Sequence, residues 1–66
     1  MALDYLSIGK RIKRYRTDKK MSQEELSQKV FVNYEHISRI ESGKVKLSLE
    51  LLVLIADTLN VSADDL

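Results

Sequence analysis

The fold is decided by residues 22–42, which read SQEELSQKVFVNYEHISRIES. Ser22, with Glu25 three residues later, forms a capping box, which is a strong start signal for a helix. Asn33 is a good N-cap for a second helix, and that helix should end before Gly43, a residue suited to a left-handed cap. The sequence therefore predicts two short helices joined by a tight turn.

The expected boundaries are 23–29 for the first helix, 31–33 for the turn and 34–42 for the second helix. The positions expected to be buried are apolar: Leu26, Val30, Val32, Ile37 and Ile40. Ser27 is small enough to let another helix approach. This is the layout of a helix-turn-helix over about 22–42, a motif whose second helix is presented to the DNA major groove. An ordinary helical hairpin in a small bundle explains the same apolar positions equally well.

A basic helix is predicted ahead of this unit, over 5–19. Its apolar face is marked at helical spacing by Ile8, Ile12 and Tyr15. The opposite face is basic and carries Lys10, Lys13 and Arg14. Residues 1–20 hold seven basic and two acidic residues, whereas the rest of the chain holds four basic and eight acidic ones. The basic end is suited to a polyanion, and a solvated helix face is the alternative.

Two more helices are expected after the central unit. Ser48 caps a helix over 49–59, the most apolar segment, and Asn60 can take a left-handed end cap. A similar cap pattern recurs in 61–66, where we expect a fifth helix to begin. No segment alternates with a period of two, so we expect one compact all-α domain of five helices over 1–66.

Composition excludes several classes of protein. A chain of 66 residues has room for one domain. With no cysteine and one histidine, a disulfide framework and a Cys/His zinc site are excluded, so we expect no metal and no cofactor. No apolar run approaches the roughly 20 residues that cross a bilayer, and the N-terminus lacks the order of a secretory signal. We expect a cytoplasmic protein without a membrane partner.

An enzyme is not expected. Adjacent acids occur at two helix starts, Glu24 with Glu25 and Asp64 with Asp65, where the helix dipole explains them. No nucleophile, base and orienting group are brought together by the sequence pattern.

The chain resembles the phage repressor and Cro-like helix-turn-helix family, also called the xenobiotic response element family. The resemblance rests on the stretches IGKRIKRYR, MSQEELSQKV, HISRIESGK and SLELLVLIADTLNVSADDL, which occur in the family's order and with its gaps. It implies a lambda-repressor-like fold and a sequence-specific DNA-binding transcriptional regulator, a repressor, that is associated with the nucleoid.

The resemblance makes Asn33, Tyr34, Glu35 and Arg39 the base-reading residues. Their chemistry is compatible with this role. Arg39 can donate twice to guanine, Glu35 can accept from cytosine N4, and the ring of Tyr34 can touch a thymine methyl. The alternative for Glu35 and Arg39 is an ordinary i, i+4 salt bridge on an exposed helix face.

A larger group is expected to contact the DNA backbone: Gln23, His36, Ser38, Ser42, Lys44, Lys46, Lys10 and Arg14. In similar proteins the residue at Gln23 hydrogen-bonds a phosphate. The alternative is that Gln23 is simply a polar residue at the start of a helix. Lys44 and Lys46 lie in the loop where relatives carry basic residues against the backbone. For the basic residues of the helix over 5–19, a contact with flanking phosphates and a solvated face are equally good expectations.

The resemblance also assigns two residues to architecture. In similar proteins the arginine at Arg16 pairs with the acid at Glu41, which ties the first helix to the end of the DNA-reading helix. Losing one partner of such a partly buried pair is expected to cost several kcal/mol.

Two positions depart from the family's pattern. Phe31 stands in the turn where relatives usually have glycine, and Leu47 stands where relatives often have proline. A bulky residue at positive φ costs about 1 to 2 kcal/mol. We therefore expect either a different turn geometry or a compensating burial of Phe31.

The partners expected are double-stranded DNA and a second copy of the chain. A homodimer on a palindromic operator would read two half-sites about one helical turn apart, with the fourth and fifth helices supplying the two-fold contact by analogy with the family. One alternative is an antitoxin or adaptor that uses the same fold mainly to bind a protein. Another is the N-terminal module of a longer regulator with an additional C-terminal domain.

Overall fold

The computed structural model describes residues 4–66, which are all-helical. Four α-helices occur in this part of the chain: α1 (Tyr5–Asp18), α2 (Gln23–Lys29), α3 (Tyr34–Glu41) and α4 (Leu49–Leu59). A single 3-10 turn, η1 (Ala63–Asp65), follows them. The all-α prediction is confirmed, and the helix boundaries agree with the expected ones to within one residue.

The expectation of five helices is wrong for the part of the chain that the structure describes. Ser62 and Asp65 do form the expected start signal, because the amide of Ser62 donates to the carboxylate of Asp65 at 3.1 Å. Only one turn follows, with the amide of Leu66 donating to the carbonyl of Ala63. A capping box specifies where a helix begins, whereas propagation depends on the residues after it.

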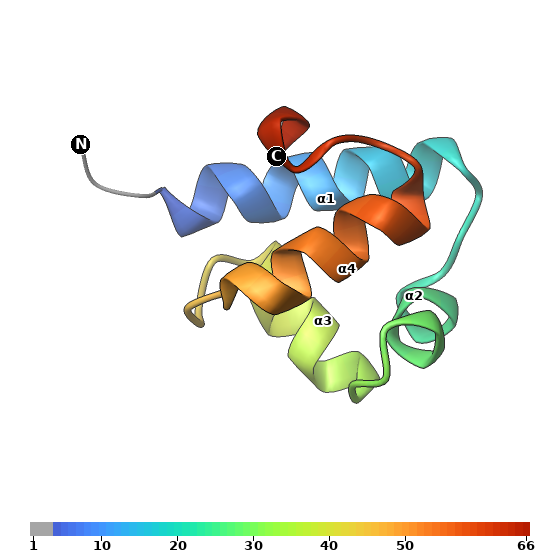
Figure 1. Ribbon diagram of the computed structural model, residues 1–66. Helices are drawn as coiled ribbons and strands as arrows, with labels where there is room; N and C mark the ends of the chain where they lie inside the picture. Colours follow the sequence, from blue (N-terminus) through green and yellow to red (C-terminus); the bar gives the residue numbers. More distant parts are fainter. Residues whose placement is uncertain (1–3) are drawn as a thin grey trace.

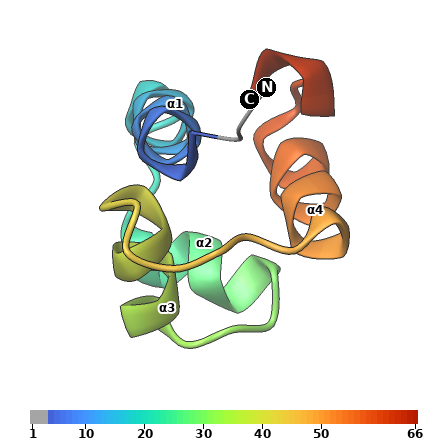
Figure 2. The same ribbon diagram turned by 90° about the vertical axis from the view of Figure 1, so that its left-hand side faces the viewer.

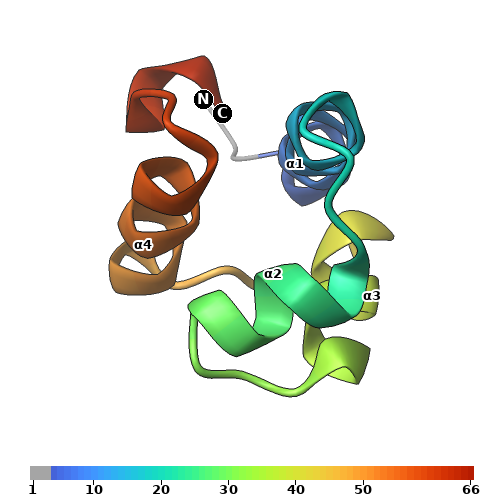
Figure 3. The same ribbon diagram turned by 90° about the vertical axis from the view of Figure 1, so that its right-hand side faces the viewer.

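The helices α2 and α3 pack on each other, and α1 packs on α3. Figure 1 shows α2 and α3 side by side beneath α1 and α4. Figures 2 and 3 view the molecule from its two ends, and in both α1 and α4 lie on opposite sides above the α2–α3 pair. The turn that joins α2 to α3 lies at the edge of the molecule away from α1. This arrangement leaves the outer side of α3 uncovered by the other helices.

Local hydrogen bonds explain where the helices begin and end. The capping box at α2 is complete, because Glu25 N donates to Ser22 Oγ at 3.0 Å and Ser22 N donates to Glu25 Oε1 at 3.2 Å. Asp4, which the sequence pattern did not single out, caps α1, and a hydrogen bond from the Ser7 hydroxyl lowers the pKa of its carboxyl. Asn60 ends α4 in the left-handed conformation, as predicted.

One core holds the helices together. Its fully buried side chains come from all four: Ile12, Leu26, Val30, Ile37, Ile40, Ile55 and Leu59. On α4 the buried face is narrower than its composition indicates. Leu49 and Val53 remain exposed, although the run of apolar residues predicts a largely buried helix.

The helices α1 and α3 cross at Gly9. A Cβ atom at this position would collide with the carbonyl oxygen of Ile40 and lie 2.8 Å from that of Glu41. Only glycine allows the backbone of α1 to come this close to the last turn of α3. The sequence pattern did not reveal this requirement, because a close approach between helices leaves no local signal.

Candidate nucleic-acid interface

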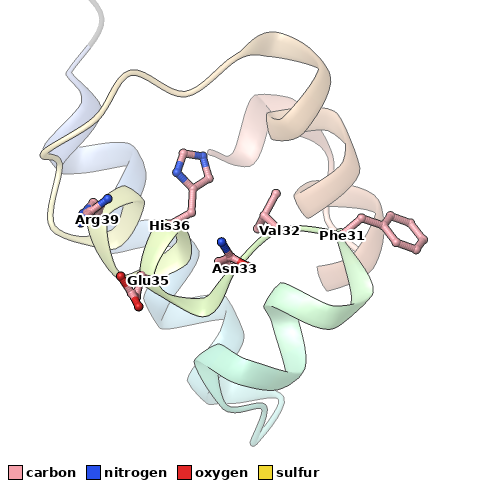
Figure 4. Close-up of a pocket in the computed structure, with 6 residues that line it drawn as sticks. All are labelled: Phe31, Val32, Asn33, Glu35, His36 and Arg39. Carbon is pink, nitrogen blue, oxygen red and sulfur yellow. The ribbon is translucent and has the colours of Figure 1, made fainter.

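A shallow cavity of about 570 Å³ lies against the exposed side of α3. It is lined by Phe31, Val32, Asn33, Glu35, His36 and Arg39. Figure 4 shows Glu35 and Arg39 at one end, Phe31 at the other, and Asn33 with His36 between them. We call the surface formed by Asn33, Glu35, His36 and Arg39 the recognition face. The structure thus brings together four of the residues that the sequence assigns to DNA.

The N-terminal end of α3 carries polar side chains that form no hydrogen bond with the residues the structure describes. Asn33 occupies the N-cap position, but its side chain makes no capping hydrogen bond, unlike that of Ser22 on α2. Tyr34, the first residue of α3, is 54% exposed. Asn33 lines the cavity, whereas Tyr34, which the sequence also assigns to base reading, does not.

Glu35 and Arg39 are both exposed on α3. Within residues 4–66 the only ion pair joins Arg16 to Glu41. The i, i+4 salt bridge that the sequence also allows between Glu35 and Arg39 is therefore absent. Arg39 keeps its guanidinium donors for another acceptor, and Glu35 keeps its carboxylate for another donor.

The C-terminal end of α3 is held by a buried network. Arg16 Nε donates to Glu41 Oε2 at 2.7 Å, and a second guanidinium nitrogen donates to Glu41 Oε1 at 3.0 Å. Both residues are less than a tenth exposed. Arg16 also donates to the carbonyl of Met21 at 2.7 Å. The pair that the family resemblance implies is present, and it connects α1, the α1–α2 turn and α3.

Gln23 belongs to the same network. Its side-chain nitrogen Nε2 donates to Glu41 Oε1 at 3.0 Å, which the sequence pattern did not reveal. An amide nitrogen has two N–H donors, so one remains for another acceptor. The bond to Glu41 holds the side chain of Gln23 in one orientation at the start of α2.

The loop after α3 places two further cations on the surface. Lys44 and Lys46 are exposed and lie in the segment between α3 and α4. His36 and Ser38, on α3, are half-buried. The hydroxyl of Ser42 donates to the carbonyl of Ser38 at 2.8 Å, so its single O–H donor is already used within the helix.

The basic residues of α1 are not part of the cavity. Lys10, Lys13 and Arg14 are exposed on α1, and none of them lines the cavity beside α3. The guanidinium carbon of Arg14 lies 5.4 Å from the ring centre of Tyr15, which is the distance of a cation–π contact.

Phe31 contradicts both expectations drawn from its departure from the family pattern. The turn keeps the left-handed geometry, with φ at 63°, so it is not different. The side chain is 86% exposed, so burial does not compensate for the strain. Such a backbone conformation costs a bulky residue about 1 to 2 kcal/mol. Phe31 and Val32 are the two cavity residues that the sequence did not assign to the site. Val32, expected to be buried, is half-buried against the core, and the exposure of Phe31 cannot be read from its identity.

Within residues 4–66, no group of three or more metal-ligating side chains is close enough to hold a metal ion. The helices of this part of the chain are also too short or too polar to cross a membrane. Of the acids that the sequence placed at helix starts, Glu25 and Asp65 are used there as caps.

A protein-family model described as helix-turn-helix matches residues 12–66. An uncharacterized HTH-type transcriptional regulator from Archaeoglobus fulgidus is 41% identical over 56 residues, which covers 85% of this chain and 79% of the relative. The crystal structure of the clp gene regulator ClgR from Corynebacterium glutamicum superposes with a TM-score of 0.92 at 28% identity, covering 97% of this chain and 68% of that one. The biofilm master regulator SinR, solved in complex with DNA, has a TM-score of 0.79 at 36% identity, with coverages of 86% and 92%.

Proposed function

Because the chain belongs to the helix-turn-helix family, we propose that it is a sequence-specific DNA-binding transcriptional regulator that reads the major groove with α3. Membership of the family confirms the resemblance seen in the sequence. The regulator relatives and the DNA complex of SinR support this function. In this role the protein acts on chromosomal DNA, as a cytoplasmic protein associated with the nucleoid.

One observation carries the proposal: Arg39 and Glu35 are exposed on the recognition face and are not paired with each other. Arg39 is suited to guanine, and Glu35 is suited to the amino group of cytosine. Glu35 also repels phosphate, so its contribution is to specificity more than to affinity. Lys44 and Lys46 supply the positive charge for the DNA backbone next to this face.

We assign the protein the role of a repressor that binds a palindromic operator as a homodimer. Leu49 is 73% exposed and Val53 is 42% exposed, one helical turn apart on α4. They supply an apolar surface for a two-fold contact between copies, and two copies present two α3 helices to successive major grooves. Light scattering at micromolar concentration in the presence of operator DNA checks the dimer, and a strict monomer on a two-half-site operator contradicts it.

The test begins with selection of duplexes from fragmented genomic DNA at physiological salt, followed by sequencing. Enrichment of a short palindrome is expected. Affinity for that duplex is then measured for Arg39→Ala, Lys46→Ala and the control Lys29→Ala, which removes an exposed charge outside the cavity. Arg39→Ala should cost about 1 to 3 kcal/mol and relax specificity at one base pair, and Lys46→Ala should lower the salt slope by about 1.

The alternative is that the fold mainly binds a protein, as in an antitoxin or adaptor. In that case no duplex exceeds the background expected from phosphate attraction, and Arg39→Ala binds DNA as the unchanged protein does. Either result would count against the DNA-reading role of α3.

A further inference from the structure

Phe31 is the least explained side chain of the described residues. It is a large apolar residue, almost fully exposed, in a left-handed turn that a glycine adopts without strain. Strain of this kind persists at sites where function uses it. Contact with a partner outside the chain would account for both the exposure and the strain.

The position of Phe31 indicates which partner it meets. Phe31 lines the same cavity as Asn33, Glu35, His36 and Arg39, and in Figure 4 it lies at the end opposite Arg39, with its ring directed outward. Two exposed apolar residues of α4, Leu49 and Val53, do not line this cavity. Phe31 thus lies at the border of the recognition face, in a cavity that no residue of the surface proposed for the dimer lines.

We propose that Phe31 is a specificity-determining residue that contacts the C5-methyl group of a thymine at the edge of the half-site. This inference rests on the proposed function, since it requires the recognition face to meet the major groove. Among the groups that base pairs present there, the others are hydrogen-bond donors and acceptors, and the thymine methyl is apolar. A phenyl ring has no hydrogen-bonding atom, so the methyl is the base-edge group that it can recognise.

The proposal divides the cavity into a polar and an apolar end. Arg39 and Glu35 read guanine or cytosine at one end by hydrogen bonds, and Phe31 reads thymine at the other by apolar contact. The half-site is therefore expected to carry a thymine beyond the base pairs that α3 contacts through its polar side chains.

The experiment compares three variants on the selected duplex. Phe31→Gly removes the ring and the strain, Phe31→Leu keeps an apolar side chain, and Lys20→Gly is the matched control. Lys20 also has a positive φ, 57°, but it lies in the α1–α2 turn and does not line the cavity. Each protein is measured on duplexes in which uracil, which lacks only the methyl group, replaces thymine at one position at a time.

Phe31→Gly is expected to bind about tenfold more weakly, a loss of roughly 1.4 kcal/mol, while Phe31→Leu keeps most of the affinity. At one thymine, the uracil substitution should weaken the unchanged protein and leave Phe31→Gly unaffected. The salt slope should not change, because the ring neutralises no phosphate. Lys20→Gly should bind normally. Both glycine variants should melt at a higher temperature, which excludes unfolding as the cause of weaker binding.

Three results would overturn the proposal. The first is an unchanged affinity of Phe31→Gly for the duplex. The second is a loss of affinity in Phe31→Gly when the unchanged protein has no uracil-sensitive position. The third is a change in dimer formation by Phe31→Gly in the absence of DNA. Arg39→Ala separates this failure from that of the proposed function. If Arg39→Ala loses affinity and Phe31→Gly does not, only the role of Phe31 is wrong, whereas if neither variant differs, α3 does not read DNA.

Discussion

The two ends of α3 differ in how they are attached to the molecule. At the C-terminal end, Glu41 is 6% exposed and accepts hydrogen bonds from Arg16 and Gln23. At the N-terminal end, Asn33 is exposed and makes no capping bond, and Phe31 is 86% exposed. A charged residue is thus buried at one end, and an aromatic residue is in water at the other.

This difference shows that the polarity of a side chain does not by itself decide its place. Glu41 is buried because Arg16 and Gln23 satisfy its carboxylate, and a buried charge is tolerated when it is paired and hydrogen-bonded. Phe31 is exposed because its turn lies at the edge of the molecule. The anchored end of α3 supports the fold, and the free end is available to a partner.

The largest expected effect comes from breaking the anchored end. Arg16→Ala leaves the carboxylate of Glu41 buried with only Gln23 as a donor, and it should lower the free energy of unfolding by about 3 to 5 kcal/mol. Urea unfolding followed by circular dichroism measures this loss. The double variant Arg16→Met, Glu41→Leu should recover much of it, because no unpaired charge remains. An equal loss in the double variant would show that packing, and not the charge, anchors α3.

A smaller effect is expected at the helix crossing next to this network. Gly9→Ala places a methyl group against the carbonyls of Ile40 and Glu41, which are backbone atoms and cannot rotate away. Overpacking of this kind costs typically about 1 to 3 kcal/mol, and thermal unfolding measures it. A Gly9→Ala protein as stable as the unchanged one would mean that α1 can move away from α3 without loss.

The smallest effect separates the two kinds of N-cap. Ser22→Ala removes a hydrogen bond that begins α2 and should cost about 1 kcal/mol. Asn33→Ala removes no capping bond, so its stability should lie within about 0.5 kcal/mol of the unchanged protein. In DNA binding the order should reverse, with Asn33→Ala the weaker binder. A large loss of stability in Asn33→Ala would show that its side chain supports the fold.

The helix boundaries and most of the core could be predicted from the sequence because their signals are local. Ser22 with Glu25, Ser48 and Asn60 all act at the helix ends that their spacing indicates. The sequence pattern failed where the outcome depends on the segments that surround a residue in the folded protein. It did not identify Leu49 and Val53 as the apolar residues of α4 that stay exposed, or show that 61–66 form only one 3-10 turn.

The same division between local signals and long-range contacts applies to the candidate site. Asn33, Glu35, His36 and Arg39 were expected on one surface because they are the polar, non-core positions along one short helix, and the structure brings them to one cavity. The bond between Gln23 and Glu41 could not be predicted, because 18 residues separate them and only the packing of α2 on α3 joins them.

The sequence by itself determined the bounds of the four helices, the caps at Ser22, Ser48 and Asn60, and the family, because these signals and the motif spacing are read along the chain. The tertiary structure alone decided which end of α3 is anchored, that Gly9 must be glycine, and that Phe31 faces outward. These features depend on which segments meet in space. The burial of a side chain and the partners of a charge depend on contacts between distant segments, so no single stretch of sequence specifies them.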